Sequence, residues 1–188
     1  MEQRTSEGAA DCGRVVVAVS GSRGSAHALA WALRAAEVSG RELEVVTVWP
    51  GQGEVLVGEA PGHYSLPRHL AARAQARALA EATAARAGAV PVRRVLANGR
   101  VADVLVDASD GADVLVLGTH RSASAAGAPE RGVAAAVLPR VACAVVEVDP
   151  TGAARVRGEV ARADRGRRGP FTLAHPAVAP MGGVPPRA

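Results

Sequence analysis

The chain of 188 residues contains no lysine, and all 22 of its basic residues are arginine. This absence excludes a phosphate-binding loop of the GxxxxGK[ST] type, in which the lysine reaches the β- and γ-phosphates. It also excludes catalysis through a lysine Schiff base. Aromatic residues make up only 2% of the chain. The core must therefore consist of small and branched aliphatic side chains, which suits a parallel sheet flanked by alanine-rich helices.

Cysteine and clustered histidine are also scarce. Cys12 and Cys143 stand far apart in the sequence and form neither a metal-ligand spacing nor a disulfide framework. The five histidines are scattered and lack the helical spacing with an acidic partner that is typical of a zinc site. We therefore expect no metal site, and the cysteine usage fits a reducing cytoplasm.

Long apolar runs are absent as well. No stretch approaches the 18 or so consecutive apolar residues that a membrane-spanning helix needs. The first dozen residues are polar and acidic, unlike a secretory signal. We expect a soluble cytoplasmic protein that does not enter a membrane.

The positive charge is confined to one end of the chain. The formal net charge is +4, but residues 151–188 hold seven arginines against Glu159 and Asp164, which leaves −1 for residues 1–150. The basic isoelectric point therefore describes a tail and not a binding face of the domain. This tail contains one aromatic residue, Phe171, and so lacks the stacking platform of many single-strand binders. We do not expect it to bind nucleic acid.

Short apolar runs and helical spacings alternate along the chain. Buried strands are predicted at residues 15–19, 43–48, 92–97, 113–118 and 143–148. Helical patterns lie between them, around Leu29–Ala36, Arg68–Ala87, Val101–Ala108 and before Pro139. Strands that alternate with helices predict right-handed crossovers and a doubly wound, five-stranded parallel sheet with helices on both faces, an α/β fold.

We divide the chain into three parts. Residues 1–13 lack apolar periodicity and are predicted to be a flexible arm, and residues 14–149 form the domain. From residue 150 onward the chain is rich in Arg, Gly and Pro with few large apolar residues, so we predict a disordered tail.

The segment LVLGTHRSASAAGAPERGVAAAVLPR, residues 115–140, has the order strand, loop, helix that often holds phosphate on free helix amides. Together with VVVAVSGS, LEVVTVW, GRVADVLVDASDGADVLVLG and CAVVEV, it resembles the universal stress protein family over roughly residues 14–149. The resemblance implies a flavodoxin-like sheet of strand order 3-2-1-4-5. Ligands of such sheets bind beyond the carboxyl ends of the strands, where the strand order reverses.

ATP-binding members of that family place the phosphates on a G-x2-G-x9-G-[ST] loop, and the resemblance maps this pattern onto the chain only in part. Gly118 matches the first loop glycine, and Val48 matches the apolar residue beside the adenine. Arg121 stands at the second glycine position and Arg131 at the third. Gly132 then replaces the small hydroxyl residue, or takes the third glycine position if one residue is inserted. The acidic residue typical after the first strand is Ser20 here.

These departures leave two interpretations open. A side chain at a loop glycine obstructs positive φ angles and close backbone approach, and Ser20 lacks the charge that strengthens a hydrogen bond. This favours a non-catalytic regulatory or sensing module with a degenerate nucleotide pocket and no cofactor. Arginine also binds phosphate through a planar fork of donors, so the alternative is an ATP-binding protein in which Arg121 and Arg131 replace the glycines.

Two further expectations concern catalysis and association. Ser20 lies between a strand and a helix, but its surroundings, AVSGS, are not the G-x-S-x-G of a hydrolase nucleophile, and we expect no enzyme activity. In the implied strand order the fifth strand is an edge, and Ala144 to Val148 would leave unpaired backbone groups. Family members commonly pair through this edge, so the resemblance implies a homodimer.

Overall fold

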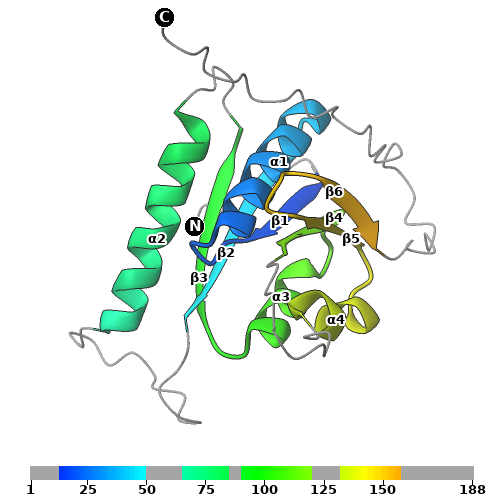
Figure 1. The fold of residues 1–188 in the computed structure, drawn as a ribbon. Helices are drawn as coiled ribbons and strands as arrows, with labels where there is room; N and C mark the ends of the chain where they lie inside the picture. The colour runs from blue at the N-terminus through cyan, green and yellow to red at the C-terminus, as the bar shows by residue number, and fades with distance from the viewer. Residues whose placement is uncertain (1–12, 50–64, 85–89, 120–131, 158–188) are drawn as a thin grey trace, which may run out of the picture.

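The computed structural model describes residues 13–49, 65–84, 90–119 and 132–157, and within these ranges it has one sheet with helices on both faces (Figure 1). The elements follow in the order β1 (Arg14–Ala18), α1 (Arg23–Ser39), β2 (Glu42–Trp49), α2 (Leu66–Thr83), β3 (Val92–Asn98), α3 (Val101–Ser109), β4 (Val114–Gly118), α4 (Val133–Val137), a 3-10 turn (Leu138–Arg140), β5 (Ala144–Val148) and β6 (Ala154–Arg157).

The strand order is β3-β2-β1-β4-β5-β6. The first five of these strands pair in parallel, in the order 3-2-1-4-5 that the resemblance implied. The predicted α/β fold and its strand order are therefore confirmed. None of the described helices is both long and apolar enough to cross a membrane.

The sheet differs from the prediction at one edge, where β6 pairs antiparallel with β5. The five-stranded, wholly parallel sheet was therefore wrong by one strand, and this strand comes from residues that the composition assigned to a disordered tail. A tight turn explains the difference, because the Asp149 carboxylate accepts hydrogen bonds from the backbone of Thr151 and Ala153 at 2.8 and 3.1 Å. The rest of the tail, from residue 158, and residues 1–12 of the arm lie outside the described residues.

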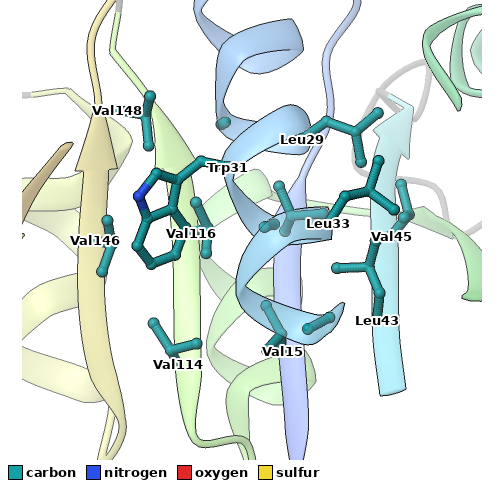
Figure 2. Packing of buried hydrophobic residues seen from close by; sticks show 14 of the residues in the cluster. Val15, Leu29, Trp31, Leu33, Leu43, Val45, Val114, Val116, Val146 and Val148 are labelled. Carbon is teal, nitrogen blue, oxygen red and sulfur yellow. The ribbon is translucent and has the colours of Figure 1, made fainter. Parts of the chain in front are cut away.

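Helix α1 packs across the centre of the sheet. Ser22 begins it as an N-cap whose hydroxyl accepts from the Ser25 amide at 3.2 Å, and Gly40 ends it in the left-handed conformation at φ 63°. Small residues alternate with leucine on its inner face, and Trp31 extends toward Val146 and Val148 of β5 (Figure 2). The aliphatic core predicted from the scarcity of aromatics is confirmed, with Trp31 as its one large ring among the described residues.

The two faces of the sheet have separate cores. Helices α1 and α2 cover the face that carries Val15, Val17 and Val45, whereas α3 and α4 cover the face that carries Val16 and Leu115. Successive residues of a strand point to opposite faces, so a continuous apolar run fills both cores. This is the physical reason why β1 and β4 lack the alternation of a half-exposed strand.

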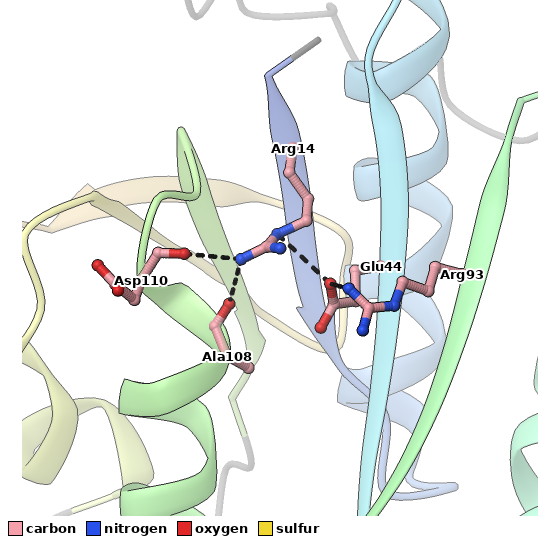
Figure 3. A network of polar contacts seen from close by, with 5 residues as sticks. All are labelled: Arg14, Glu44, Arg93, Ala108 and Asp110. Carbon is pink, nitrogen blue, oxygen red and sulfur yellow. Dashed lines mark hydrogen bonds and ion pairs between the residues drawn. The ribbon is translucent and has the colours of Figure 1, made fainter. Parts of the chain in front are cut away.

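At the amino ends of the strands, charged side chains tie four elements together (Figure 3). The buried Glu44 carboxylate lies 3.4 Å from the Arg14 guanidinium and 3.3 Å from that of Arg93. Arg14 also donates to the backbone carbonyls of Ala108 and Asp110 at 3.1 and 2.7 Å. These contacts lock β1, β2, β3 and the end of α3 at the end of the sheet opposite the candidate site.

Candidate functional site

The candidate site lies at the carboxyl ends of β1 and β4. These strands pair directly, with Val15 opposite Val114 and Val17 opposite Val116. Because the pair is parallel, the turn after Val19 and the turn after Leu117 leave the same end of the sheet, as the sequence predicted. This is the point where the strand order reverses, and ligands of doubly wound sheets bind there.

The turn after β1 is small and carries no charge before α1. Ser20 is exposed, and its hydroxyl donates to the Ser22 hydroxyl at 3.1 Å. Gly21 adopts the left-handed conformation at φ 81°, which lets the chain reverse tightly into α1. Ser20 thus stands where the resemblance expects a carboxylate, and it offers a ligand only a neutral hydroxyl.

Gly118 has a packing role that the sequence did not reveal. A Cβ atom at this position would lie about 2.5 Å from the Ser25 backbone nitrogen and would collide with the backbone of Gly24. In return, a Cβ atom at Gly24 would collide with the Thr119 carbonyl. The first turn of α1 therefore rests directly on the end of β4, and both glycines are needed for this approach.

Gly24 and Thr119 also belong to the site, and neither was predicted from the sequence. The one available signal was the second glycine in GSRGS, at the position where a helix starts after a strand. Thr119 continues the sheet beyond β4, because its amide donates to the Val148 carbonyl at 2.8 Å. The end of β4 is thereby tied both to α1 and to β5.

Val48 and Gly132 are the other predicted site residues that the structure describes. Val48 is half-buried near the end of β2, where it packs against the core on the α3 and α4 face of the sheet. Gly132 is the N-cap of α4, with φ −58° and no atom within 4 Å of a Cβ placed there. The structure therefore leaves room for a side chain at position 132, in contrast to position 118.

Arg121 and Arg131 lie outside the described residues, as does His120. Whether these arginines replace the loop glycines stays a prediction. Within the described ranges, no group of three acidic, histidine or cysteine side chains could hold a metal ion.

Cys143 lies just before β5, outside this site, and it is buried. Burial raises the pKa of its thiol, and a hydrogen bond with Ser109 opposes that shift. A thiol that is buried and protonated is a poor nucleophile. The role of Cys143 is therefore that of a small side chain in the core.

The fold defines a doubly wound α/β domain whose strand order reverses between β1 and β4, the place where ligands of such sheets bind. Comparison with known families identifies the class further, because residues 12–149 match the model of the universal stress protein family. The chain belongs to that family, which confirms the resemblance seen in its sequence.

Solved structures agree with this assignment. A universal stress protein in complex with cAMP is 25% identical with a TM-score of 0.51, and the match covers 74% of this chain and 98% of that one. A protein of the family from Burkholderia pseudomallei is also 25% identical with a TM-score of 0.51, and the match covers 75% of this chain and 98% of that one. No curated protein matches the sequence.

Proposed function

We propose that this protein is a non-catalytic regulatory or sensing module of the universal stress protein family, with a degenerate nucleotide pocket at the carboxyl ends of β1 and β4. The observation that carries the proposal is the neutral, exposed Ser20, whose hydroxyl already bonds to Ser22 at 3.1 Å. A nucleoside hydroxyl at this place would lack the charge-assisted bond that roughly doubles the strength of a neutral one.

The contact between Gly118 and α1 supports the same proposal. Gly118 matches the first glycine of the family's phosphate loop. Here the backbone of Gly24 and Ser25 leaves no room for a side chain at this position. Its presence is thus explained by packing, without any phosphate. A serine needs a histidine or carboxylate as a base to act as a nucleophile, and in the described part of the chain the Ser20 hydroxyl donates instead to the Ser22 hydroxyl.

A second candidate is a nucleotide-responsive protein in which Arg121 and Arg131 bind phosphate. The observation in its favour is the relative solved in complex with cAMP, whose fold and chain length this domain shares. A single phosphate asks for fewer loop contacts than a triphosphate does, and an arginine fork can supply them.

Calorimetric titration with ATP and with cAMP separates the two candidates. We expect no saturable heat from the native chain with either nucleotide, and a gain of ATP binding in the triple variant Ser20→Asp, Arg121→Gly, Arg131→Gly. The matched control is Arg73→Ala, an exposed arginine of α2 that is not among the predicted site residues. Micromolar binding by the native chain that is lost in Arg121→Ala and Arg131→Ala would contradict the degenerate pocket and support the second candidate, in which these arginines bind phosphate.

The absence of catalysis is tested separately, with a fluorophosphonate probe and intact-mass measurement. We expect the native chain and Ser20→Ala to remain equally unmodified. Stoichiometric labelling of the native chain that disappears in Ser20→Ala would reveal an activated serine.

A further inference from the structure

The outer edge of β5 is covered by a strand from the same chain. Strand β6 pairs antiparallel with β5 through four residue pairs, from Val145 opposite Arg157 to Val148 opposite Ala154. A buried, nearly uncharged strand such as AVVEV would otherwise present unpaired N–H and C=O groups, which is the template for pairing with another chain. Within the described residues, β6 therefore occupies the place that a second copy would take.

Besides the backbone pairing and the packing of Ala154 against the core, three contacts hold β6 against this edge. The Arg157 guanidinium bonds to the Glu147 carboxylate at 2.6 Å, and Val156 lies opposite Val146 in the strand pair. The turn is closed by Asp149, whose amide donates to the Ala153 carbonyl at 2.9 Å. The pairing is thus specific in register, because each contact fixes the position of β6 along β5.

These contacts are nevertheless weak in comparison with the rest of the sheet. Strand β6 has four residues, and Arg155, Val156 and Arg157 are exposed, with Val156 at 52%. The side chain of Arg157 is 51% exposed, and ion pairs of this kind contribute about 0.2 to 1 kcal/mol. By contrast, Val145, Val146 and Val148 of β5 are buried, so β5 stays in place when β6 leaves.

The charges distinguish the two edges that a second copy could use. Pairing β6 antiparallel with β6 of a second copy, about Val156, would set Arg155 opposite Arg157, and like charges directly opposite each other are destabilising. Pairing β5 with β5 of a second copy, about Val146, sets Val145 opposite Glu147 and brings no like charges together. The outer edge of β6 thus resists self-association, and the outer edge of β5 favours it.

We propose that β6 is a displaceable cover of the β5 edge: it keeps the chain monomeric while it is paired, and its release lets β5 pair with β5 of a second copy. A second copy of the chain is the expected partner for two reasons. The β5 edge already accepts an antiparallel strand, and the sequence of β5 is apolar and can pair with itself. The proposal does not depend on nucleotide binding.

Sedimentation velocity of the full chain at micromolar concentration tests the proposal. We expect the native chain to sediment as a monomer and the variant Arg155→Pro, Arg157→Glu to sediment as a dimer. Arg155 lies opposite Glu147, where a proline removes a ladder donor, and a glutamate at position 157 repels Glu147. The milder Arg157→Ala should lower the dimer dissociation constant by about tenfold. The charge-matched control, Arg73→Glu on α2, should remain monomeric.

A monomeric, folded double variant would overturn the proposal, with circular dichroism as the check of folding, and so would an Arg157→Ala variant that does not dimerise at a lower concentration than the native chain. If the double variant does not fold, amide hydrogen exchange of the native chain at rising concentration decides instead. Amides of β6 should then lose protection while those of β5 keep it, and a native dimer that keeps β6 protected would overturn the proposal.

Discussion

The centre of the sheet and its two edges are held by different kinds of contact. At the centre, Val15, Val17, Val114 and Val116 are fully buried, and α1 covers them with a face of small and aliphatic residues. At one edge, α2 has 18 residues and fully buries a single one, the polar Gln75. At the other edge, β6 is held by an ion pair and a hydrogen-bonded turn.

The difference shows where the molecule is strong and where it can change. Apolar burial contributes to the free energy of folding in proportion to the buried area, and a packed core tolerates little rearrangement. A hydrogen bond or ion pair is directional and is lost when one partner changes. The candidate site lies at the strong part, because Gly24 and Gly118 join α1 to β4. The weak parts, β3 with α2 and β6, are the edges that a partner would meet.

Removal of the largest central side chain is expected to have the largest effect. Trp31 is buried against β4 and β5 (Figure 2), so Trp31→Ala leaves a cavity that α1 cannot close. We expect a loss of about 3 to 5 kcal/mol in the free energy of unfolding, measured by urea denaturation followed by circular dichroism. A loss below about 1 kcal/mol would show that the centre does not rest on this packing.

The contact between the two glycines should come next. In Gly118→Ala the added methyl meets the backbone of Gly24, which no side-chain rotation can relieve. We expect a loss of about 2 to 3 kcal/mol in the free energy of unfolding, again by urea denaturation. Gly132→Ala is the matched control, because its surroundings are open, and it should change stability by less than about 0.5 kcal/mol. Equal losses in the two variants would contradict the packing role of Gly118.

Much of the centre could be predicted from the sequence, because buried parallel strands form continuous apolar runs. The runs 15–19, 43–48, 92–97, 113–118 and 143–148 agree with the observed strands to within two residues at each end. The edge strand β6 could not be predicted in this way. Its residues, ARVR, resemble the tail that follows them, and only the turn built by Asp149 distinguishes them.

The candidate site was predictable in location but not in its contacts. The alternation of strands and helices predicted a parallel sheet, and the resemblance implied the strand order that sets β1 beside β4. The observed parallel pairing of these strands places Ser20 and Gly118 at one end of the sheet. The resemblance gave Gly118 a role in a phosphate-binding loop. Its packing role could not be predicted, because sequence alone cannot show that α1 approaches β4 closely enough to exclude a side chain. Gly24 was missed for the same reason.

The α2 edge should respond to the loss of a single polar side chain. Gln75 Nε2 donates to the carbonyls of Val45 and Val95 at 2.9 and 3.0 Å, and its Oε1 accepts from Arg94 at 3.1 Å. We expect Gln75→Ala to lower the free energy of unfolding by about 1 to 2 kcal/mol, because buried partners lose their bonds.

Hydrogen exchange distinguishes this local effect from a global one. In Gln75→Ala the amides of α2 and β3 should lose more protection than those of α1. Arg73→Ala, an exposed change on the same helix, should leave both sets unchanged. Equal loss of protection in α1 and α2 would mean that Gln75 anchors the whole domain and not one edge.

The smallest effect is expected at the turn before β6, and it should depend on pH. Hydrogen bonds from the side chain and backbone of Thr151 lower the pKa of the Asp149 carboxyl, with a smaller contribution from the charge of Arg155. A lowered pKa means that the ionised form stabilises the folded turn above the ordinary carboxyl pKa of about 3.9, and that this contribution is lost as the pH falls through the folded-state value. The Thr151 amide resonance should report the loss.

Asp149→Asn removes the titration from this turn, so its Thr151 amide should show no step in the acid range. The same hairpin holds a second carboxylate, that of Glu147 in its ion pair with Arg157. Glu147→Gln separates the two groups, since it should keep the step at Thr151. An unchanged step in Asp149→Asn would show that the β6 edge is not held by this carboxylate, and the contrast between an apolar centre and polar edges would then apply to α2 alone.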